Sequence, residues 1–202
     1  MNLDQQLKFE QVWDKGDYRK GSTAHRLVDR LMDVIPADAS INDYGSGTGR
    51  AEVEIRRRRH GQRINMIDIA SNALEAEACA LLKEPGVTFT LADLSDLGGL
   101  PRAEWGICIN VLMTVPPEDL NRILYEIRNT CDNLFFEVYD FEDERLGMQM
   151  TTVKMNAEQW WKKLSAFWET IILEKSPESP RRYIFICRRR SELGTQHNGV
   201  FR

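Results

Sequence analysis

The sequence has few of the features that mark disulfide frameworks, metal centres or membrane spans. Four cysteines are scattered over 202 residues, with no C-x-x-C pair. No run of about 18 apolar residues is present, so no transmembrane helix is indicated. The first residues lack the basic start and apolar core of a signal peptide. These absences predict a reduced, cytoplasmic protein with no disulfide, no metal site and no membrane association.

An excess of positive charge is also missing, because the formal net charge is −4. That balance argues against a protein that wraps nucleic acid. The arginines are concentrated locally, at 56–59, 181–182 and 188–190. Such clusters are typical either of solvated faces or of docking patches for a phosphate-bearing partner, and the sequence leaves both interpretations open.

Hydrophobic content of 42% and charged content of 29% are typical of a soluble globular protein. The length suits one domain that buries its own core, which we place at residues 1–190 with an N-terminal helical cover over about 1–36. Residues 191–202 contain little apolar character, and we expect a disordered tail there.

The most informative stretch is Ile41-Asn42-Asp43-Tyr44-Gly45-Ser46-Gly47-Thr48-Gly49. It is typical of a short strand that breaks into a glycine-rich turn and then opens a helix. Glycines at alternate positions allow sharp turning and let a ligand approach the main chain and the amides of the helix start. Taken alone, the pattern also fits an ordinary loop.

Two acids repeat at the same interval after Asp43, each at the end of an apolar segment. Asp68 follows Ile64-Asn65-Met66-Ile67, and Asp93 follows Val87-Thr88-Phe89-Thr90-Leu91-Ala92. Open α/β sheets bind ligands at the carboxyl ends of their strands. Asp68 is therefore suited to accept hydrogen bonds from a ribose diol, and Asp93 from the exocyclic amine of an adenine.

Together, D-Y-G-S-G-T-G, I-D-I-A and L-A-D-L-S-D-L resemble the first three motifs of the class I S-adenosylmethionine-dependent methyltransferases. The nicotinamide-binding alternative requires G-x-G-x-x-G, but Arg50 occupies its last glycine position. The resemblance implies S-adenosylmethionine as cofactor and a methyl-transferring enzyme. It implies a cofactor site made of Asp43, Gly45, Ser46, Gly47, Gly49, Asp68, Ile69, Asp93, Leu94 and Asn110.

The N-terminal segment resembles the cover that many small methyltransferases place over the cofactor. Trp13, Tyr18 and Arg19 carry this likeness. Tyr18 is expected to bound the methionine end of the cofactor, and Arg19 to pair with its carboxylate. An anchoring aromatic residue and a surface arginine are an equally good interpretation.

A fourth resemblance lies in N-V-L-M-T-V-P-P-E-D, where Thr114 stands at a position that is often histidine in the family. A threonine hydroxyl is a poor general base, so no catalytic residue is assigned. The D/N-P-P-Y/F signature of amino-methylating DNA enzymes is absent, because Glu118 follows the two prolines. Glu137, Tyr139 and Asp140 are the polar groups best placed to face an acceptor.

The remaining pattern alternates strands and helices, which predicts an α/β fold. With the resemblance, we expect a three-layer αβα Rossmann-like methyltransferase sheet, mostly parallel with an antiparallel last strand. Helices are expected at 3–13, 22–35, 50–60, 71–84, from 117 and from 156, with Asn156 and Gln159 forming a capping box. Strands are expected near 41–43, 64–68, 87–93, 105–113, 133–139, 167–173 and 182–187.

Methyl transfer to a small-molecule or nucleotide-sized acceptor is the function that the resemblance favours. Two alternatives remain: a methyltransferase that acts on protein or nucleic acid, and a cofactor-binding module without turnover. Because the leaving thioether is already activated, such a reaction needs alignment and an apolar pocket more than a catalytic side chain. The acceptor and the oligomeric state are not encoded in these patterns.

Overall fold

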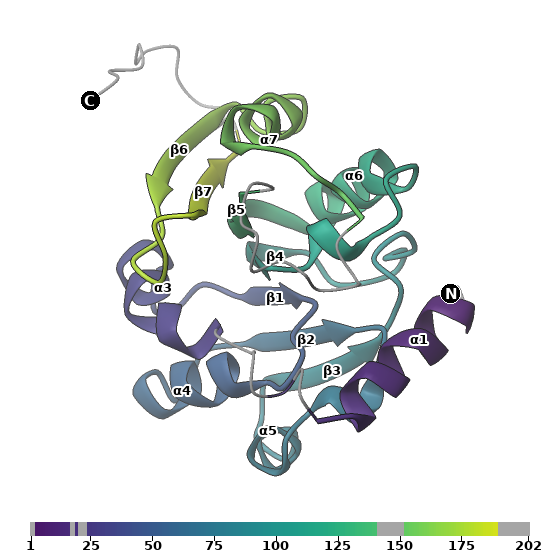
Figure 1. Ribbon diagram of the computed structural model, residues 1–202. Helices are drawn as coiled ribbons and strands as arrows, with labels where there is room; N and C mark the ends of the chain where they lie inside the picture. Colours follow the sequence, from purple (N-terminus) through teal and green to yellow (C-terminus); the bar gives the residue numbers. More distant parts are fainter. Residues whose placement is uncertain (1–2, 17–18, 20–23, 141–151, 190–202) are drawn as a thin grey trace.

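Seven strands form one twisted sheet at the centre of the molecule (Figure 1). The computed structural model describes residues 3–16, 19, 24–140 and 152–189. The strands follow the order β3-β2-β1-β4-β5-β7-β6. Neighbouring strands are parallel from β3 to β5, and β7 runs antiparallel to both β5 and β6. Their bounds are Ile41–Tyr44 (β1), Ile64–Asp68 (β2), Val87–Leu91 (β3), Ala103–Ile109 (β4), Cys131–Tyr139 (β5), Thr170–Lys175 (β6) and Arg182–Arg188 (β7).

Helices cover both faces of this sheet. One core cluster joins α6 and α7 to the sheet, and a second joins α3, α4 and α5 to its other face. The helices are Leu3–Asp14 (α1), Val28–Val34 (α3), Arg50–Arg58 (α4), Ala76–Leu81 (α5), Leu120–Thr130 (α6) and Ala157–Leu164 (α7), with short 3₁₀ turns at Ala24–Leu27 (η1), Ser71–Ala73 (η2) and Leu112–Thr114 (η3). The expected three-layer fold with an antiparallel last strand is confirmed.

Strand β1 lies in the middle of the sheet and alternates its side chains between the two layers. Tyr44 points to the α6 side, where its hydroxyl lies 2.8 Å from Thr130 Oγ1. Asn42 points the same way and donates to the Thr130 carbonyl oxygen at 2.9 Å. Ile41 belongs to the core cluster on the α4 side. Asp43, two residues after Ile41, therefore also faces α4.

Several expected element bounds were wrong. The strand expected to reach 113 ends at Ile109, because Asn110 adopts a left-handed φ of 59° and turns the chain into η3. The helix expected at 71–84 breaks into η2 and α5, since Leu74 and Glu75 are extended between them. The proposed cap at Ser22 lies outside the described residues.

The first strand of the last hairpin begins later in the chain than the sequence pattern predicts. Residues 167–168 belong to the turn that ends α7, where the Trp168 amide donates to the Leu164 carbonyl oxygen at 3.0 Å, and β6 begins at Thr170. The capping box of Asn156 and Gln159 is confirmed. Trp160 and Trp168 are buried, so the aromatic stripe of this segment belongs mainly to the core.

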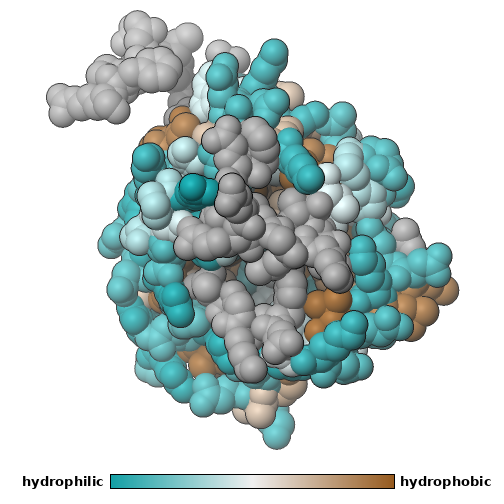
Figure 2. Space-filling view, viewed as in Figure 1, coloured by the Kyte–Doolittle hydropathy of each residue, from teal (hydrophilic) through white to brown (hydrophobic). Residues whose placement is uncertain are grey.

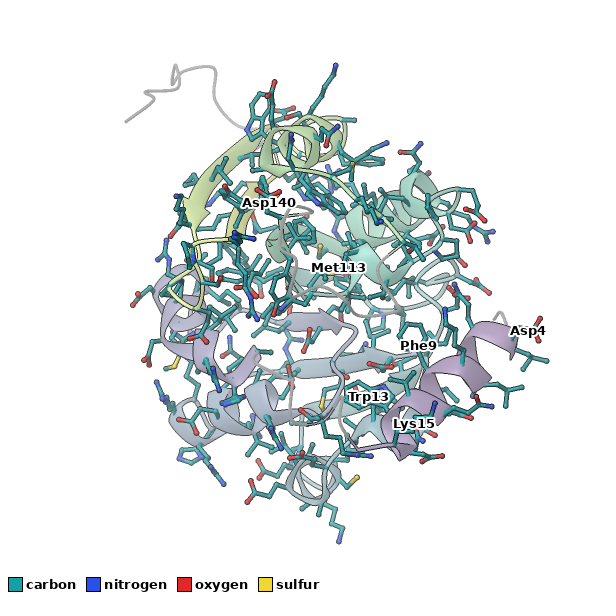
Figure 3. The ribbon with its side chains drawn as sticks, in the orientation of Figure 1. Asp4, Phe9, Trp13, Lys15, Met113 and Asp140 are labelled. Atoms are coloured by element: carbon teal, nitrogen blue, oxygen red, sulfur yellow. The ribbon has the colours of Figure 1, made fainter. Side chains whose placement is uncertain are left out.

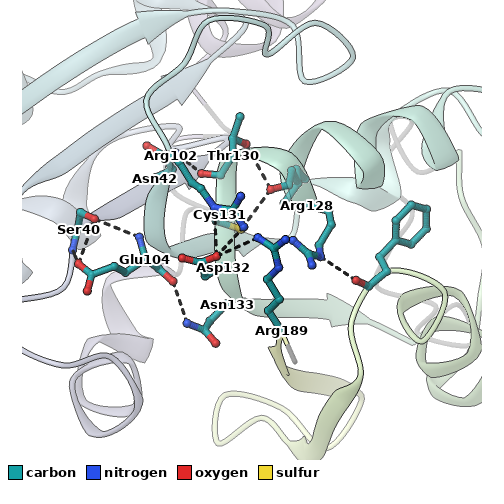
Figure 4. Close-up of polar contacts among 12 residues, drawn as sticks. Ser40, Asn42, Arg102, Glu104, Arg128, Thr130, Cys131, Asp132, Asn133 and Arg189 are labelled. Atoms are coloured by element: carbon teal, nitrogen blue, oxygen red, sulfur yellow. Dashed lines mark hydrogen bonds and ion pairs between the residues drawn. The ribbon is translucent and has the colours of Figure 1, made fainter. Parts of the chain in front are cut away.

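The arginine clusters are largely tied into the fold. Buried Arg56 bonds Glu84 at 2.9 Å and the Gln62 carbonyl oxygen at 2.8 Å. Arg59 donates to the Ile35 carbonyl oxygen near the end of α3 at 2.7 Å. At the amino-terminal edge of the strands, Asp132 accepts from Arg102 and Arg189 (Figure 4). These guanidinium groups therefore act as internal ties between elements.

Thiol accessibility gives a first prediction. Cys79 is exposed, whereas Cys108, Cys131 and Cys187 are buried and reduced. Burial raises the pKa of the Cys131 thiol to about 12. Because thiolates are the reactive species, an aromatic disulfide reagent at pH 8 is expected to modify one thiol in the native protein and four in denaturant. Rapid labelling of two or more thiols in the native state would contradict the packing described here.

Candidate functional site

A cavity of about 360 Å³ opens at the carboxyl ends of the strands. This is the location where open α/β sheets bind their ligands, and the volume suits a small organic molecule. The predicted cofactor residues that line it are Gly45, Ser46, Gly47, Asp68, Ile69, Asp93, Leu94 and Asn110. Asp43, Gly49 and Arg19 lie outside the lining, and Tyr18 lies outside the described residues.

The glycine turn is shaped so tightly that two of its glycine positions leave no room for a side chain. Gly45 has a φ of 80°, and a Cβ atom there would lie 2.3 Å from Val111 Cγ2. Gly49 has a φ of 73°, and its Cβ atom would lie 2.4 Å from Ala78 Cβ. Both positions therefore require glycine for conformation and for close packing. The turn leaves bare main chain facing the cavity.

Asp68 fastens this turn to the end of β2. Its Oδ2 accepts from the Gly47 amide at 2.8 Å, and its Oδ1 accepts from the Ala70 amide at 3.0 Å. Burial raises the pKa of Asp68, and these backbone amides oppose that rise. Since a carboxylate has about four lone-pair sites, Asp68 retains acceptor capacity toward the cavity.

Two further groups in the lining offer polar atoms to a ligand. The Ser46 hydroxyl is buried and has no hydrogen-bond partner among the described residues. Asp93 accepts from the Ser95 amide at 2.9 Å and also lines the cavity. Buried polar atoms without partners are rare in folded proteins, so Ser46 is an expected contact for a bound molecule.

Asn110 is held in one orientation by the strand beside it. Its amide Nδ2 donates to Glu137 Oε2 at 3.0 Å. The opposite atom, Oδ1, is buried and has no partner among the described residues. Because Asn110 lines the cavity, its free oxygen adds a hydrogen-bond acceptor to the floor of the site.

Glu137 is the centre of a buried polar network under this floor. It is fully buried, accepts from Ser176 Oγ at 2.5 Å and lies 3.7 Å from Arg182 Nη1. Burial raises the pKa of Glu137, whereas Ser176, Arg182 and Asn110 lower it. The Arg182 guanidinium also stacks on the Tyr139 ring at 3.9 Å. Of the acceptor-facing candidates, Tyr139 lines the cavity, whereas Glu137 and Asp140 do not.

Helix α1 covers one side of the cavity. Phe9 and Trp13 lie on the side of this helix that faces the sheet (Figure 3). Trp13 Cη2 would lie 3.2 Å from a Cβ atom at Gly47, so the indole rests on the glycine turn. Asn72 donates to the Glu10 carbonyl oxygen at 3.0 Å and anchors the helix.

Arg19 takes part in the same cover. It donates to the Ala73 carbonyl oxygen at 2.9 Å and to that of Asn72, and it lies 5.9 Å from the centre of the Trp13 ring. The Arg19 guanidinium is therefore hydrogen-bonded to the main chain of η2. The predicted pairing of Arg19 with a cofactor carboxylate stays a prediction.

The part of the cavity between α1, η3 and α6 is mostly apolar. Phe9, Met113, Val115, Pro116 and Ile123 line it. The Thr114 hydroxyl donates to the Val111 carbonyl oxygen at 2.7 Å. Asp119 also faces this part, and its carboxylate receives no hydrogen bond from a described residue and does not cap α6.

Sequence reasoning did not single out Asp119 or Glu52 of α4. Asp119 occupies the residue before α6, a position where acids usually cap a helix. Glu52 falls three residues before Ile55, on the buried face of α4. A stricter reading of that periodicity would have identified a carboxyl group pointing into the core.

No helix of the described chain is long and apolar enough to cross a membrane. Among the described residues, no group of three or more His, Cys, Asp or Glu side chains is arranged to hold a metal ion. On the face seen in Figure 2, hydrophilic residues predominate and exposed apolar residues form separate small groups.

The sequence matches no protein-family model and no curated protein at a significant level. Solved structures are similar in fold. An N-methyltransferase for 1,6-didemethyltoxoflavin from Burkholderia thailandensis, with S-adenosylhomocysteine bound, has a TM-score of 0.74 at 17% identity, covering 92% of this chain and 87% of that one. The magnesium protoporphyrin IX methyltransferase of Synechocystis has a TM-score of 0.63 at 16% identity, covering 86% and 83%.

An O-methyltransferase family protein from Burkholderia thailandensis has a TM-score of 0.64 at 14% identity. The match covers 84% of this chain but 58% of that protein, so this chain spans a little over half of its length. At sequence identities of 14–17%, the similarity to these proteins is a similarity of fold. The chain therefore has the three-layer fold of these methyltransferase structures.

Proposed function

We propose that this protein is an S-adenosylmethionine-dependent methyltransferase that acts on a small-molecule acceptor. The observation that carries the proposal is the cavity, which joins the glycine turn, Asp68 and Asp93 to an apolar chamber between α1 and η3. The fold likeness to structures with S-adenosylmethionine or S-adenosylhomocysteine bound supports it.

The residues present fit this cofactor. Bare main chain at Gly45 and Gly47, the unpartnered Ser46 hydroxyl and the spare acceptor capacity of Asp68 form a polar half of the cavity. When bound, S-adenosylmethionine supplies a methyl group on a positively charged sulfur. Asp68 would hold the ribose, Asp93 the adenine and Ser46 the amino acid end. The contribution of the chain is to bind, orient and exclude water.

In this proposal the apolar part of the cavity, between α1, η3 and α6, receives the acceptor, and its lining indicates what is methylated. Its walls are apolar, and no Lys, Arg or His side chain is among the described lining residues. A strongly anionic acceptor would meet Asp119 instead of a cation. We therefore expect a small, largely apolar acceptor with an O–H or N–H group that donates to Asp119. The internal engagement of Arg56 and Arg59 gives no support to a docking patch for a macromolecule.

A panel screen tests this proposal. The protein is incubated with S-adenosylmethionine and defined phenols, aromatic amines, carboxylic acids, an oligonucleotide and a peptide mixture, and S-adenosylhomocysteine formation is measured. Turnover is expected with apolar phenols or amines. Turnover confined to the oligonucleotide or the peptides would overturn the small-molecule assignment. Cofactor binding without turnover on any acceptor would favour a binding module.

Asp119→Asn gives a prediction at the acceptor end. It removes the charge that receives the acceptor's hydrogen bond, so the KM for that acceptor is expected to rise by about 10- to 100-fold, the equivalent of one charge-assisted hydrogen bond. The Kd for S-adenosylmethionine is expected to stay within about twofold. Glu118→Gln, at the adjacent exposed residue, is the matched control. Equal KM values for both variants would remove Asp119 from acceptor binding.

A further inference from the structure

Two acids meet in the core beneath the glycine turn. Asp43 faces α4 from β1, as the alternation of that strand requires. Glu52 lies in the first turn of α4, between the core residues Ala51 and Ile55. Glu52 is fully buried, and Asp43 is 4% exposed. The two carboxyl groups lie in hydrogen-bonding contact.

This contact requires a proton. Neither oxygen of Glu52 receives a hydrogen bond from a donor group of another described residue. Two ionised carboxylates offer acceptors and no donor, so they repel each other. The contact becomes attractive when one carboxyl group carries a proton and donates it to the other. Burial raises the pKa of both groups, which is consistent with a retained proton.

Among the described residues, none of the neighbouring cations is available to replace that proton. Arg50 is bonded to Glu75 at 2.6 Å, and Arg56 to Glu84 at 2.9 Å. Asp68 from β2 adds a further negative charge near Asp43. Cys108 on β4 lies close enough to Asp43 to feel its charge, and burial and Asp43 both raise the pKa of this thiol, so Cys108 supplies no positive charge. Burial lowers the pKa of His25 on η1, which interacts with other residues. The charged groups on the other elements packed around α4 are paired elsewhere, and they are Arg26 on η1, Asp29 and Arg30 on α3, and Glu77 on α5.

The acid pair is next to the proposed cofactor site. Asp43 is separated from Gly45 by one residue, and Gly45 lines the cavity together with Asp68. The unpartnered, buried Ser46 hydroxyl is an independent sign that a polar ligand is seated over this turn. A cation bound there would favour the ionised form of the pair, whereas a ligand without net charge would do so far less.

We propose that Asp43 and Glu52 share one proton in the free protein and release it to solvent when cationic S-adenosylmethionine binds. The pair then carries one more negative charge, which favours this cofactor over S-adenosylhomocysteine, a zwitterion with no net charge. Glu52 is thus a specificity-determining residue for the charge of the cofactor. This inference rests on the proposed function, because it assumes that S-adenosylmethionine occupies the cavity.

Proton-linked calorimetry tests the inference. S-adenosylmethionine and S-adenosylhomocysteine are each titrated into the native protein in buffers of different ionisation enthalpy, over pH 6 to 9. We expect proton release with the first ligand and much less with the second. In the linked pH range, the affinity for S-adenosylmethionine should rise by up to about tenfold per pH unit, the limit for one proton. The amino group of the ligand titrates alike in all variants, so differences between variants isolate the pair.

Glu52→Gln is the test variant, because its amide can donate to Asp43 without a shared proton. We expect it to abolish the extra proton release and to lower the preference for S-adenosylmethionine over S-adenosylhomocysteine by about tenfold, a loss near 1.4 kcal/mol. Glu54→Gln, on the exposed side of the same helix, should behave like the native protein. Identical proton release in the native and Glu52→Gln proteins overturns the inference and leaves the proposed function standing. Absence of S-adenosylmethionine binding by the native protein overturns both.

Protein stability offers a second measurement that does not depend on ligands. A carboxyl group whose folded pKa lies above its unfolded pKa stabilises the fold at low pH, and this contribution is lost as pH rises through the folded pKa. Burial raises the pKa of Asp43 and Glu52. The thermal midpoint of Glu52→Gln, relative to that of the native protein, should therefore rise as the pH increases above the ordinary carboxyl range of about 4 to 5. A constant difference as the pH increases would argue against a shared proton. If Glu52→Gln does not fold, Asp43→Asn serves the same comparison.

Discussion

Glu137→Ala is expected to lower the free energy of unfolding by about 3–5 kcal/mol. The variant removes a fully buried carboxylate that receives hydrogen bonds from Ser176 and Asn110 and faces Arg182. Arg182 would keep its charge in the core without this partner, and burial already lowers the pKa of Arg182. Breaking one side of a buried ion pair is among the most costly single changes in a protein.

Chemical denaturation followed by far-ultraviolet circular dichroism measures this effect. Asp132→Ala is the control, since it also removes a β5 carboxylate that pairs with arginines, Arg102 and Arg189, but at an exposed position. That variant should lose no more than about 1 kcal/mol. Equal losses in the two variants would mean that the Glu137 network does not stabilise the fold as its burial suggests.

Asp68→Ala is expected to weaken S-adenosylmethionine binding by about 1.5–3 kcal/mol, which corresponds to roughly 10- to 150-fold in Kd. Asp68 contributes in two ways. Its carboxylate keeps acceptor capacity toward the cavity, and it fixes the glycine turn through the Gly47 amide. Removing it therefore costs a ligand contact and loosens the main chain that surrounds the ligand.

Titration calorimetry of Asp68→Ala is compared with the native protein after circular dichroism has verified folding. Asp68→Asn is an informative companion, because it preserves the volume but leaves one oxygen to serve the two backbone amides of Gly47 and Ala70. It should lie between the native protein and Asp68→Ala. An unchanged Kd in both variants would mean that the ligand does not reach the end of β2.

The layered fold and the position of the cavity were predictable because the responsible signals are local. Glycines that tolerate a positive φ and acids at strand ends are visible in a single sequence. The burial of Glu137 was not recognised, because its carboxyl group is held in the core by partners distant in sequence, such as Ser176. Those contacts depend on how the last hairpin packs against β5.

Element bounds failed where one residue overrode a pattern. The apolar run through residues 105–113 predicts a continuous strand, yet the left-handed conformation of Asn110 ends it at Ile109. This turn places Met113 and Thr114 beside the cavity instead of in the sheet. The Thr114 hydroxyl is bonded to the Val111 carbonyl oxygen within this turn. Thr114 thus helps to shape the apolar part of the cavity.

The measurement that tests the central proposal most directly is calorimetric titration of the native protein with S-adenosylmethionine and with S-adenosylhomocysteine. The structure of the cavity leads us to expect saturable binding of one molecule per chain, with a Kd on the order of micromolar, and loss of most of that affinity in Asp68→Ala. Absence of binding by both ligands, in a protein shown to be folded, would contradict the proposal that this cavity is a cofactor site.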